Sequence, residues 1–359
     1  MKKEIFFLCI IALIYACNKR DSDLIDTNTS VDSIIPIDEN QNILRDSLVR
    51  AYNDSVEKAR LDSIAQRVQD SLSQMQKKKK NNKVFEVFEG EAYSYWPIKV
   101  SDSLRKLFYQ TFNKEQQYVI AALNRIDTDH INRRDTLIVP NVFKQSFIEY
   151  SPFPNTVELL QQVDKFVIFS YPIQAFAVYE HGKLIKWGPS NMGKQSAQTP
   201  RQLYFTNWKG RKVRSTVDDE WILNWNFNLH NTEGVGWHQY ALPGYPASHS
   251  CLRLLDADAQ WLYNWADQWV LQDKHTVKVK GTPTVVYGDY TFGVKGIWHQ
   301  LVKNPSITTI SESELTKEIE PYINEILKQQ DIRRKYRGLD NPTLNDTLNI
   351  VKDSLNLKI

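Results

Sequence analysis

This sequence has few cysteines, little excess charge and no long apolar run. Of its 359 residues only 3 are Cys, and Cys251 alone lies beyond the first 20 positions. The formal net charge of +3 is too small for a chain of this length to indicate a nucleic-acid-binding protein. The sequence contains neither a histidine pair with a carboxylate at zinc-ligand spacing nor a glycine-rich phosphate loop. We therefore expect no metal site.

The first twenty residues, MKKEIFFLCIIALIYACNKR, have the pattern of an export signal. Two lysines precede an apolar run, Ile5 to Ala16, that is shorter than the about 20 residues a membrane span requires. Ala16 followed by Cys17 resembles a bacterial lipoprotein cleavage site. We expect residues 1–17 to be a signal peptide with Cys17 lipidated, which predicts a membrane-anchored lipoprotein in the periplasm or cell envelope. The alternative is an ordinary secretory signal with Cys17 incidental.

Removal of this segment leaves Cys251 without a partner for an intramolecular disulfide. A single thiol retained under oxidising conditions invites a functional explanation. A buried and inert cysteine explains the count equally well, so the count alone does not decide.

The N-terminal third divides into two predicted segments. Residues 18–83 are polar, and Asp-Ser recurs every eight positions from Asp46 to Asp70, which spreads apolar residues around a helix and lacks a coiled-coil heptad. We predict a solvated, partly helical stalk. Residues 84–160 are expected to form a small, mostly helical accessory domain. Its phrase AALNRIDTDHINRRDTLIVPN resembles the second half of a LysM glycan-binding module; the alternative is a structural lead-in domain.

From residue 164 onward, short apolar runs alternate with turn signals, which favours strands. Beside the alternating run 165–191, strands are predicted at 201–206, 221–229, 234–240 and 276–287. A helix over 256–271 would align Trp261, Trp265 and Trp269 on one face. We expect a domain at 161–303, followed at 304–359 by a helix beyond Ile307 and a polar tail. The fold class is therefore α+β, mainly β-sandwich-like, with one helix after Cys251.

A nucleophilic cysteine requires a base, a group that orients the base, and donors for the oxyanion. His249 lies two residues before Cys251, and His238 lies thirteen before it in GVGWHQYALPGYPASHSC. A turn at the intervening prolines and glycine would bring His238 beside the thiol, whereas His249 is too close in sequence to face it easily. His230 is a further rival for the base.

The phrase PGYPASHSCLRL resembles the signature of the L,D-transpeptidases with a YkuD-like catalytic domain. In that family a Ser/Thr-His-Gly-Cys phrase precedes Arg or Asn, and a histidine lies upstream on a strand. The resemblance covers about residues 164–300 and includes KFVIFSYPIQAFAVYEHGKLI, MGKQSAQTP and KGTPTVVYG. Two departures concern TPRQ, which replaces the usual Thr-Pro-x-Gly, and Ser250, which replaces glycine. If glycine's backbone conformation is required at Ser250, we expect an impaired oxyanion hole; if the local φ is negative, serine is harmless and its hydroxyl is a candidate donor.

The resemblance implies a role for each residue around the cysteine. It makes Cys251 the nucleophile and His238 its base, oriented by the backbone carbonyl of Gln239. It places the oxyanion hole at the amides near Ser250 and Cys251. The pocket is then shaped by three further residues: Ser248, His249 and Arg253. The planar guanidinium of Arg253 is a candidate for binding a substrate carboxylate.

The implied function is that of an exported peptidoglycan L,D-transpeptidase that forms 3–3 cross-links. Its partners would be a donor tetrapeptide stem, an amine acceptor and, through the lipid, a membrane; no cofactor is implied. Two alternatives remain open. With water as acceptor, the same site gives an L,D-carboxypeptidase or amidase. A catalytically silent wall-binding lipoprotein is the other.

Overall fold

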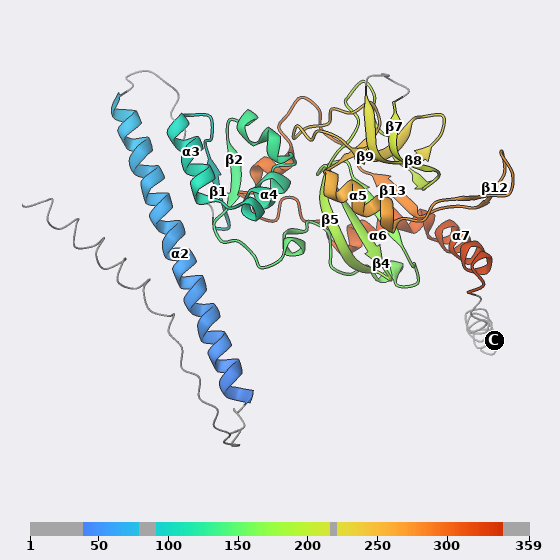
Figure 1. Ribbon diagram of the computed structural model, residues 1–359, viewed down its shortest axis with the longest axis horizontal. Coiled ribbons are helices and arrows are strands. Elements are labelled where there is room, and N and C mark those ends of the chain that lie inside the picture. Colours follow the sequence, from blue (N-terminus) through green and yellow to red (C-terminus); the bar gives the residue numbers. More distant parts are fainter. Residues whose placement is uncertain (1–38, 79–90, 216–220, 340–359) are drawn as a thin grey trace, which may run out of the picture. The chain divides into compact units, whose positions relative to one another are not determined.

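The computed structural model describes residues 39–78, 91–215 and 221–339 (Figure 1). The chain divides into two compact units, Met1–Ser55 and Val56–Ile359. The predicted signal peptide and Cys17 lie outside the described residues. Within those residues, no helix combines the length and the apolar composition needed to cross a bilayer.

Helix α2 (Glu39–Lys78) occupies most of the predicted stalk. We predicted a solvated stalk, but one turn of this helix packs on the folded part of the chain. Ile64 is 9% exposed and joins the core of the accessory segment, and Arg60 donates a hydrogen bond to Thr111 O at 2.6 Å. The helix is therefore in contact with the accessory segment through the Ile64 side chain and the Arg60 guanidinium.

The accessory segment is a strand, two helices and a second strand. Its elements are β1 (Tyr93–Trp96), α3 (Asp102–Thr111), α4 (Lys114–Leu123), the 3₁₀ helix η1 (Thr128–Arg133) and β2 (Leu137–Pro140), and β1 pairs antiparallel with β2. Ser101 caps α3, and Asn113 forms a capping box with Gln116 at the start of α4. The helical part of the predicted accessory domain is present as α3 and α4, and it is accompanied by the strands β1 and β2. Two short 3₁₀ helices, η2 (Phe147–Tyr150) and η3 (Glu158–Leu160), lead to the main sheet.

The main sheet has nine strands and curls, so that β6 contacts β8. In spatial order the strands are β6 (Leu203–Phe205), β13 (Pro283–Tyr287), β3 (Phe166–Ser170), β4 (Ala175–Glu180), β5 (Lys183–Asn191), β10 (Leu252–Leu254), β9 (Val235–Gln239), β8 (Ile222–His230) and β7 (Lys209–Arg214). Alternate residues of β3 enter two different cores, because successive side chains point to opposite faces. The α+β class is confirmed.

Two helical predictions differ from the structure. Helix α5 (Asp256–Trp265) ends six residues before the predicted position 271, and Trp269 lies outside it. The backbone N–H and C=O of Asp267 instead bond to Thr282, at 2.8 Å and 3.2 Å, which draws the chain out of the helix. The tryptophans that stay on the helix, Trp261 and Trp265, stack with ring centroids 5.3 Å apart.

Other predicted elements are divided in the structure. The strand predicted at 276–287 is split into β12 (Val277–Val279) and β13. Strand β12 pairs with β11 (Val270–Leu271). Strand β7 was not predicted. The C-terminal helix is also split, into α6 (Glu312–Ile319) and α7 (Ile323–Tyr336), with the 3₁₀ helices η4 (Ile297–Gln300) and η5 (Glu320–Tyr322) before and between them. Pro321 lies at this break, where its missing N–H interrupts the helical ladder.

The accessory segment positions the loop that carries the candidate site. Arg125 is 1% exposed, donates to Ile173 O at 2.7 Å and Ala122 O at 2.8 Å, and lies over the rings of Trp187 and Trp298. Two further bonds reach the loop after β9: Leu242 N donates to Asp127 at 2.8 Å, and Arg134 donates to Pro243 O at 2.9 Å. This loop is therefore held from outside the sheet.

Candidate active site

Three predicted site residues meet on adjacent strands. Strands β9 and β10 run parallel, with Arg253 paired to His238 and Leu252 to Trp237. Side chains of paired residues point to the same face, and so do those of residues two apart. His238, Arg253 and Cys251 therefore share one face, while Leu252 points into the opposite core.

The thiol of Cys251 lies at the start of β10, partly buried and without a disulfide partner. Its Sγ is 3.5 Å from Gly234 O. Burial raises the thiol pKa to about 11, against the lowering effects of the nearby Arg253 cation and the Gly236 amide. At neutral pH the resting group is consequently a thiol, and its reaction requires a base.

His238 is buried, and its Nδ1 lies 2.9 Å from Gln239 O. A carbonyl only accepts, so Nδ1 carries the hydrogen and Nε2 keeps a lone pair. Burial and, to a smaller extent, the Arg253 cation lower the His238 pKa to about 4, against the raising effect of the bond to Gln239 O. The imidazole is therefore neutral at pH 7 and able to accept a proton.

The residues before Cys251 are fixed by the segment that follows β5. Ser248 is buried; its N–H donates to Met192 O at 3.1 Å and its hydroxyl to Cys251 O at 2.5 Å. Thr199 donates to Ser250 O at 2.9 Å. Each residue of the Ser-His-Ser-Cys turn is thus anchored through its backbone or its hydroxyl.

Ser250 has a φ of +77°, in the left-handed region that glycine adopts without strain. The left-handed backbone that we associated with glycine is present here, although a serine occupies the position. Its hydroxyl donates to His249 O and to Glu233 O, the latter at 3.3 Å. These local hydrogen bonds offset part of the cost of the backbone conformation, about 1–2 kcal/mol.

His249 lies in a cationic corner. The Lys194 ammonium is 2.6 Å from its Nε2, so a neutral imidazole carries its hydrogen on Nδ1, which is buried without a partner in the described part of the chain. Burial and the charges of Lys194 and Arg253 lower the His249 pKa. Arg253 itself packs over the ring of Tyr240 at 4.4 Å, and among the described residues no carboxylate pairs with it.

The rival base His230 has different contacts. It ends β8, its Nδ1 accepts from Glu233 N at 3.2 Å, and its ring packs against Tyr204. The sequence analysis did not single out Lys194 or Tyr240 as residues of the site. Lys194 lies in the phrase MGKQSAQTP that we compared with the family, but its position beside His249 follows only from the fold. In residues 39–78, 91–215 and 221–339 no cluster of three metal-binding side chains occurs.

Part of the chain is similar to a known family. The family model of the YkuD L,D-transpeptidase catalytic domain matches residues 164–286, which contain Cys251, His238 and Arg253. No curated protein matches the sequence.

Solved structures similar to the chain include an L,D-transpeptidase (Yku) from Stackebrandtia nassauensis, at 22% identity over 35% of this chain and 57% of that one, with a TM-score of 0.29. An L,D-transpeptidase from Mycobacterium smegmatis is 20% identical over 35% of this chain and 59% of that one, with a TM-score of 0.28. L,D-transpeptidase 3 from Mycobacterium tuberculosis, in complex with a faropenem-derived adduct, is 21% identical over 35% of this chain and 61% of that one, with a TM-score of 0.28. This chain spans less than two thirds of each of them. Residues 164–286 are thus similar to the L,D-transpeptidase catalytic domain of the YkuD family.

Proposed function

We propose that this protein is a peptidoglycan L,D-transpeptidase with Cys251 as nucleophile and His238 as general base. The observation that carries the proposal is the pairing of His238 with Arg253 on β9 and β10, with Cys251 one residue before β10 and close enough to Arg253 for the cation to lower its pKa. Residues 164–286 match the model of the YkuD L,D-transpeptidase catalytic domain, and this range contains Cys251 and His238. The reaction is the transfer of an acyl group from one stem peptide to another, which forms a 3–3 cross-link.

The reaction has two balanced steps. Cys251 Sγ attacks the carbonyl of the third stem residue while its proton moves to Nε2 of His238. The bond to the terminal D-alanine then breaks, and the amine leaves with that proton, which gives a thioester. In the second step the acceptor amine attacks the thioester, His238 takes the amine proton, and the Cys251 thiol is released.

The electrostatics of the resting site support a general-base role over a preformed ion pair. A thiol pKa of about 11 and an imidazole pKa of about 4 keep both groups neutral before substrate binds. Proton transfer then accompanies attack on the carbonyl. A neutral pair also avoids the cost of holding two buried charges in the free enzyme.

The cationic corner supports a donor that carries carboxylates. Lys194 lies beside His249, the charges of Lys194 and Arg253 both act on His249, and the charge of Arg253 also acts on the thiol. A stem carboxylate bound by the guanidinium of Arg253 would gain charge-assisted hydrogen bonds. The same ligand would offset the positive charge that lowers the His238 pKa, and so make the base stronger when substrate is present.

The left-handed turn at Ser250 supports an oxyanion hole at the neighbouring amides. A left-handed residue in a tight turn brings successive N–H groups toward one point, which forms an anion-binding concavity. The Ser250 carbonyl is held away by Thr199. We propose that the amides near Ser250 and Cys251 stabilise the negative oxygen of the tetrahedral intermediate.

Mass spectrometry of the full chain with a disaccharide tetrapeptide tests the proposal. We expect an adduct at Cys251 and dimers that are one D-alanine lighter than two donors. An adduct with only shortened monomers would instead make the protein a hydrolase with the same site. A Cys251→Ala variant should give neither adduct nor product. Wild-type protein that forms no adduct and no product would refute the enzymatic proposal and favour a wall-binding role.

We also propose that Cys17 is lipidated and anchors an exported protein in the cell envelope. This rests on the sequence, since Cys17 lies outside the described residues. Expression in a bacterium with and without a Cys17→Ala change, followed by mass analysis of the N-terminus, tests it. We expect a lipid mass on Cys17 and membrane association that the variant loses. An unmodified N-terminus on the exported wild-type protein would contradict lipidation.

A further inference from the structure

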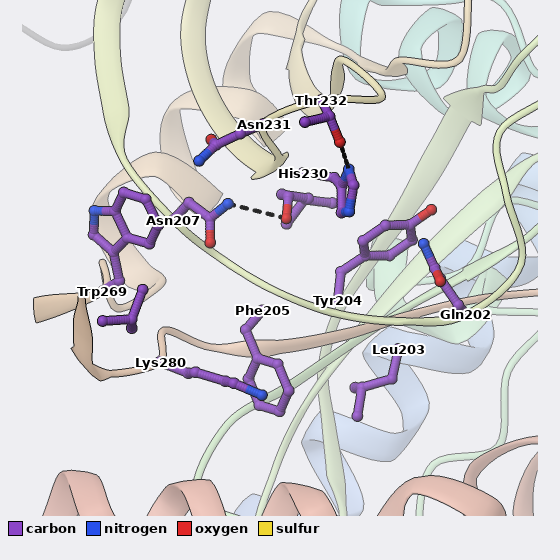
Figure 2. Close-up of a pocket in the computed structure, with 12 residues that line it drawn as sticks. Gln202, Leu203, Tyr204, Phe205, Asn207, His230, Asn231, Thr232, Trp269 and Lys280 are labelled. Atoms are coloured by element: carbon purple, nitrogen blue, oxygen red, sulfur yellow. Dashed lines mark hydrogen bonds between the residues drawn. The ribbon is translucent and has the colours of Figure 1, made fainter. Parts of the chain in front are cut away.

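Apart from the site around Cys251, a pocket lies where the two ends of the curled sheet meet. It has a volume of about 450 Å³, within the range of about 300–1,000 Å³ that is typical of small-molecule sites. Strand β6, the end of β8, Trp269 and Lys280 line it. In Figure 2, Trp269 and Asn207 lie on one side and Tyr204 and Gln202 on the other. We call it the seam pocket.

His230 contributes a hydrogen-bond donor to the seam pocket. Its Nδ1 accepts from the backbone N–H of Glu233 at 3.2 Å and lies 3.3 Å from the Thr232 hydroxyl (Figure 2). A neutral imidazole with Nδ1 accepting carries its hydrogen on Nε2. Within the described ranges that Nε2 has no protein partner. His230 was weighed above as a catalytic base, and this geometry gives it a binding use instead.

Two carboxamides add an acceptor and a donor. The Asn207 amide donates to Leu229 O at 3.1 Å (Figure 2), which leaves its oxygen available as an acceptor. The Asn231 oxygen accepts from Asn228 at 2.6 Å and from Trp208 at 3.2 Å, which leaves its NH₂ available as a donor. The seam pocket thus offers donors and acceptors together, all of them uncharged.

The remaining walls are aromatic or neutralised. Trp269 is partly exposed, and Phe205 forms part of the floor. The Lys280 ammonium lies over the Phe205 ring and pairs with Glu325 at 2.9 Å. Its charge is therefore balanced. An aromatic surface beside neutral donors and acceptors suits a sugar, because a pyranose ring has apolar C–H faces and a rim of hydroxyl groups. The Glu233 carboxylate lies 3.6 Å from His230 Nδ1, at the rim, and Lys280 is the charged residue of the lining itself.

The seam pocket and the thiol share the turn between β8 and β9. His230 is the register partner of Val235, while Gly234 O lies 3.5 Å from Cys251 Sγ and Glu233 O accepts from Ser250. Strands β9 and β10 are parallel, so both sites lie at the same end of the sheet. Three extended stem residues reach about 10 Å, so the proposal places the sugar about this far from the carbonyl that Cys251 attacks.

We propose that the seam pocket binds the sugar that carries the donor stem, an N-acetylated muramoyl saccharide. The inference rests on the proposed function for the identity of the substrate, but the saccharide site itself does not require catalysis. Trp269 packs against the sugar ring, and His230, Asn207 and Asn231 bond to its hydroxyl and acetamido groups. The stem then extends from the pocket past the β8–β9 turn to Cys251.

The test uses the full chain and two measurements. Calorimetry with the peptide-free disaccharide of N-acetylglucosamine and N-acetylmuramic acid measures sugar binding without any reaction. Acylation of Cys251 by tetrapeptide donors with and without the disaccharide gives a ratio of the two kcat/KM values. The variants are Trp269→Ala and Trp269→Phe, and the control is Tyr336→Ala, which removes an exposed aromatic side chain outside the pocket. Circular dichroism checks that each variant is folded.

We expect the disaccharide to bind, and Trp269→Ala to weaken that binding and lower the kcat/KM ratio by roughly tenfold, the equivalent of one aromatic contact. Trp269→Phe should restore most of both, and Tyr336→Ala should leave them as in the wild type. No disaccharide binding, or a kcat/KM ratio equal in wild type and Trp269→Ala, would overturn the inference. Disaccharide binding that depends on Trp269, without acylation by either donor, would support the sugar site while refuting the proposed reaction.

Discussion

His238 and Arg253 are register partners on the parallel strands β9 and β10, so a cation lies beside the proposed base. The charge of Arg253 lowers the pKa of His238 and also that of Cys251. One residue thus makes the base weaker and the thiol more acidic in the free protein. Binding of a negatively charged donor would change both effects together.

Two replacements of Arg253 distinguish the effect of its positive charge from that of its planar guanidinium group. We expect Arg253→Gln to raise the pKa of His238, because a nearby cation is lost, and to lower kcat/KM for a donor stem by roughly 10- to 100-fold through a higher KM. Arg253→Lys keeps the charge but lacks the planar fork, so its KM should lie between the two. Titration by NMR and acylation kinetics measure these effects. An unchanged KM in Arg253→Gln would exclude carboxylate binding by this residue.

The pH dependence of thiol reactivity distinguishes a neutral pair from an ion pair. With a Cys251 pKa of about 11, the thiolate fraction and therefore the alkylation rate should rise about tenfold per pH unit between pH 7 and 10. The rate is followed by mass spectrometry of the Cys251 peptide after iodoacetamide treatment. A thiolate–imidazolium pair would instead give a plateau beginning below pH 7, and such a plateau would contradict the neutral resting state.

Ser250 allows a direct test of backbone strain. At φ +77°, Ser250→Gly should remove strain and raise stability by about 0.5–1 kcal/mol, after subtraction of the entropy that glycine loses on folding. A β-branched residue fits this conformation poorly, so Ser250→Val should destabilise by more than about 1 kcal/mol. Thermal unfolding of the two variants and the wild type measures the order. Equal stability of Gly and Val variants would mean that the position is not strained.

Arg125 holds the accessory segment to the catalytic domain, and its loss should be costly. The side chain is buried, and burial lowers its pKa to about 9. Arg125→Met would leave the buried carbonyl of Ile173 without its donor, whereas Ala122 O would still accept from the backbone N–H of residue 125; we expect a cost of about 1–3 kcal/mol. Arg125→Lys should recover only part of this, because an ammonium cannot reproduce the fork. Denaturant unfolding measures both, with the exposed Arg133→Met as a matched control that should change stability little.

Local sequence predicted several elements well. The alternation in 165–191 predicted the central strands, since a period of two is read directly from apolar residues. The Ser311–Glu314 capping box marks the start of α6 through contacts only three residues apart. Predictions failed where distant residues competed with local preference. The helix after Cys251 stops at Trp265 because Asp267 bonds to Thr282, which is fifteen residues away.

The sequence by itself indicated the similarity to the YkuD family over residues 164–286, the cysteine with its upstream histidines, and the α+β class, because these depend on short phrases and local periodicity. Tertiary structure alone decided that His238 pairs with Arg253, that Ser250 adopts a left-handed backbone, and that Lys194 lies beside His249. It also brought β6 against the end of β8 and so formed the seam pocket. Such features depend on register and sheet curvature, which arise from contacts between residues far apart in the chain.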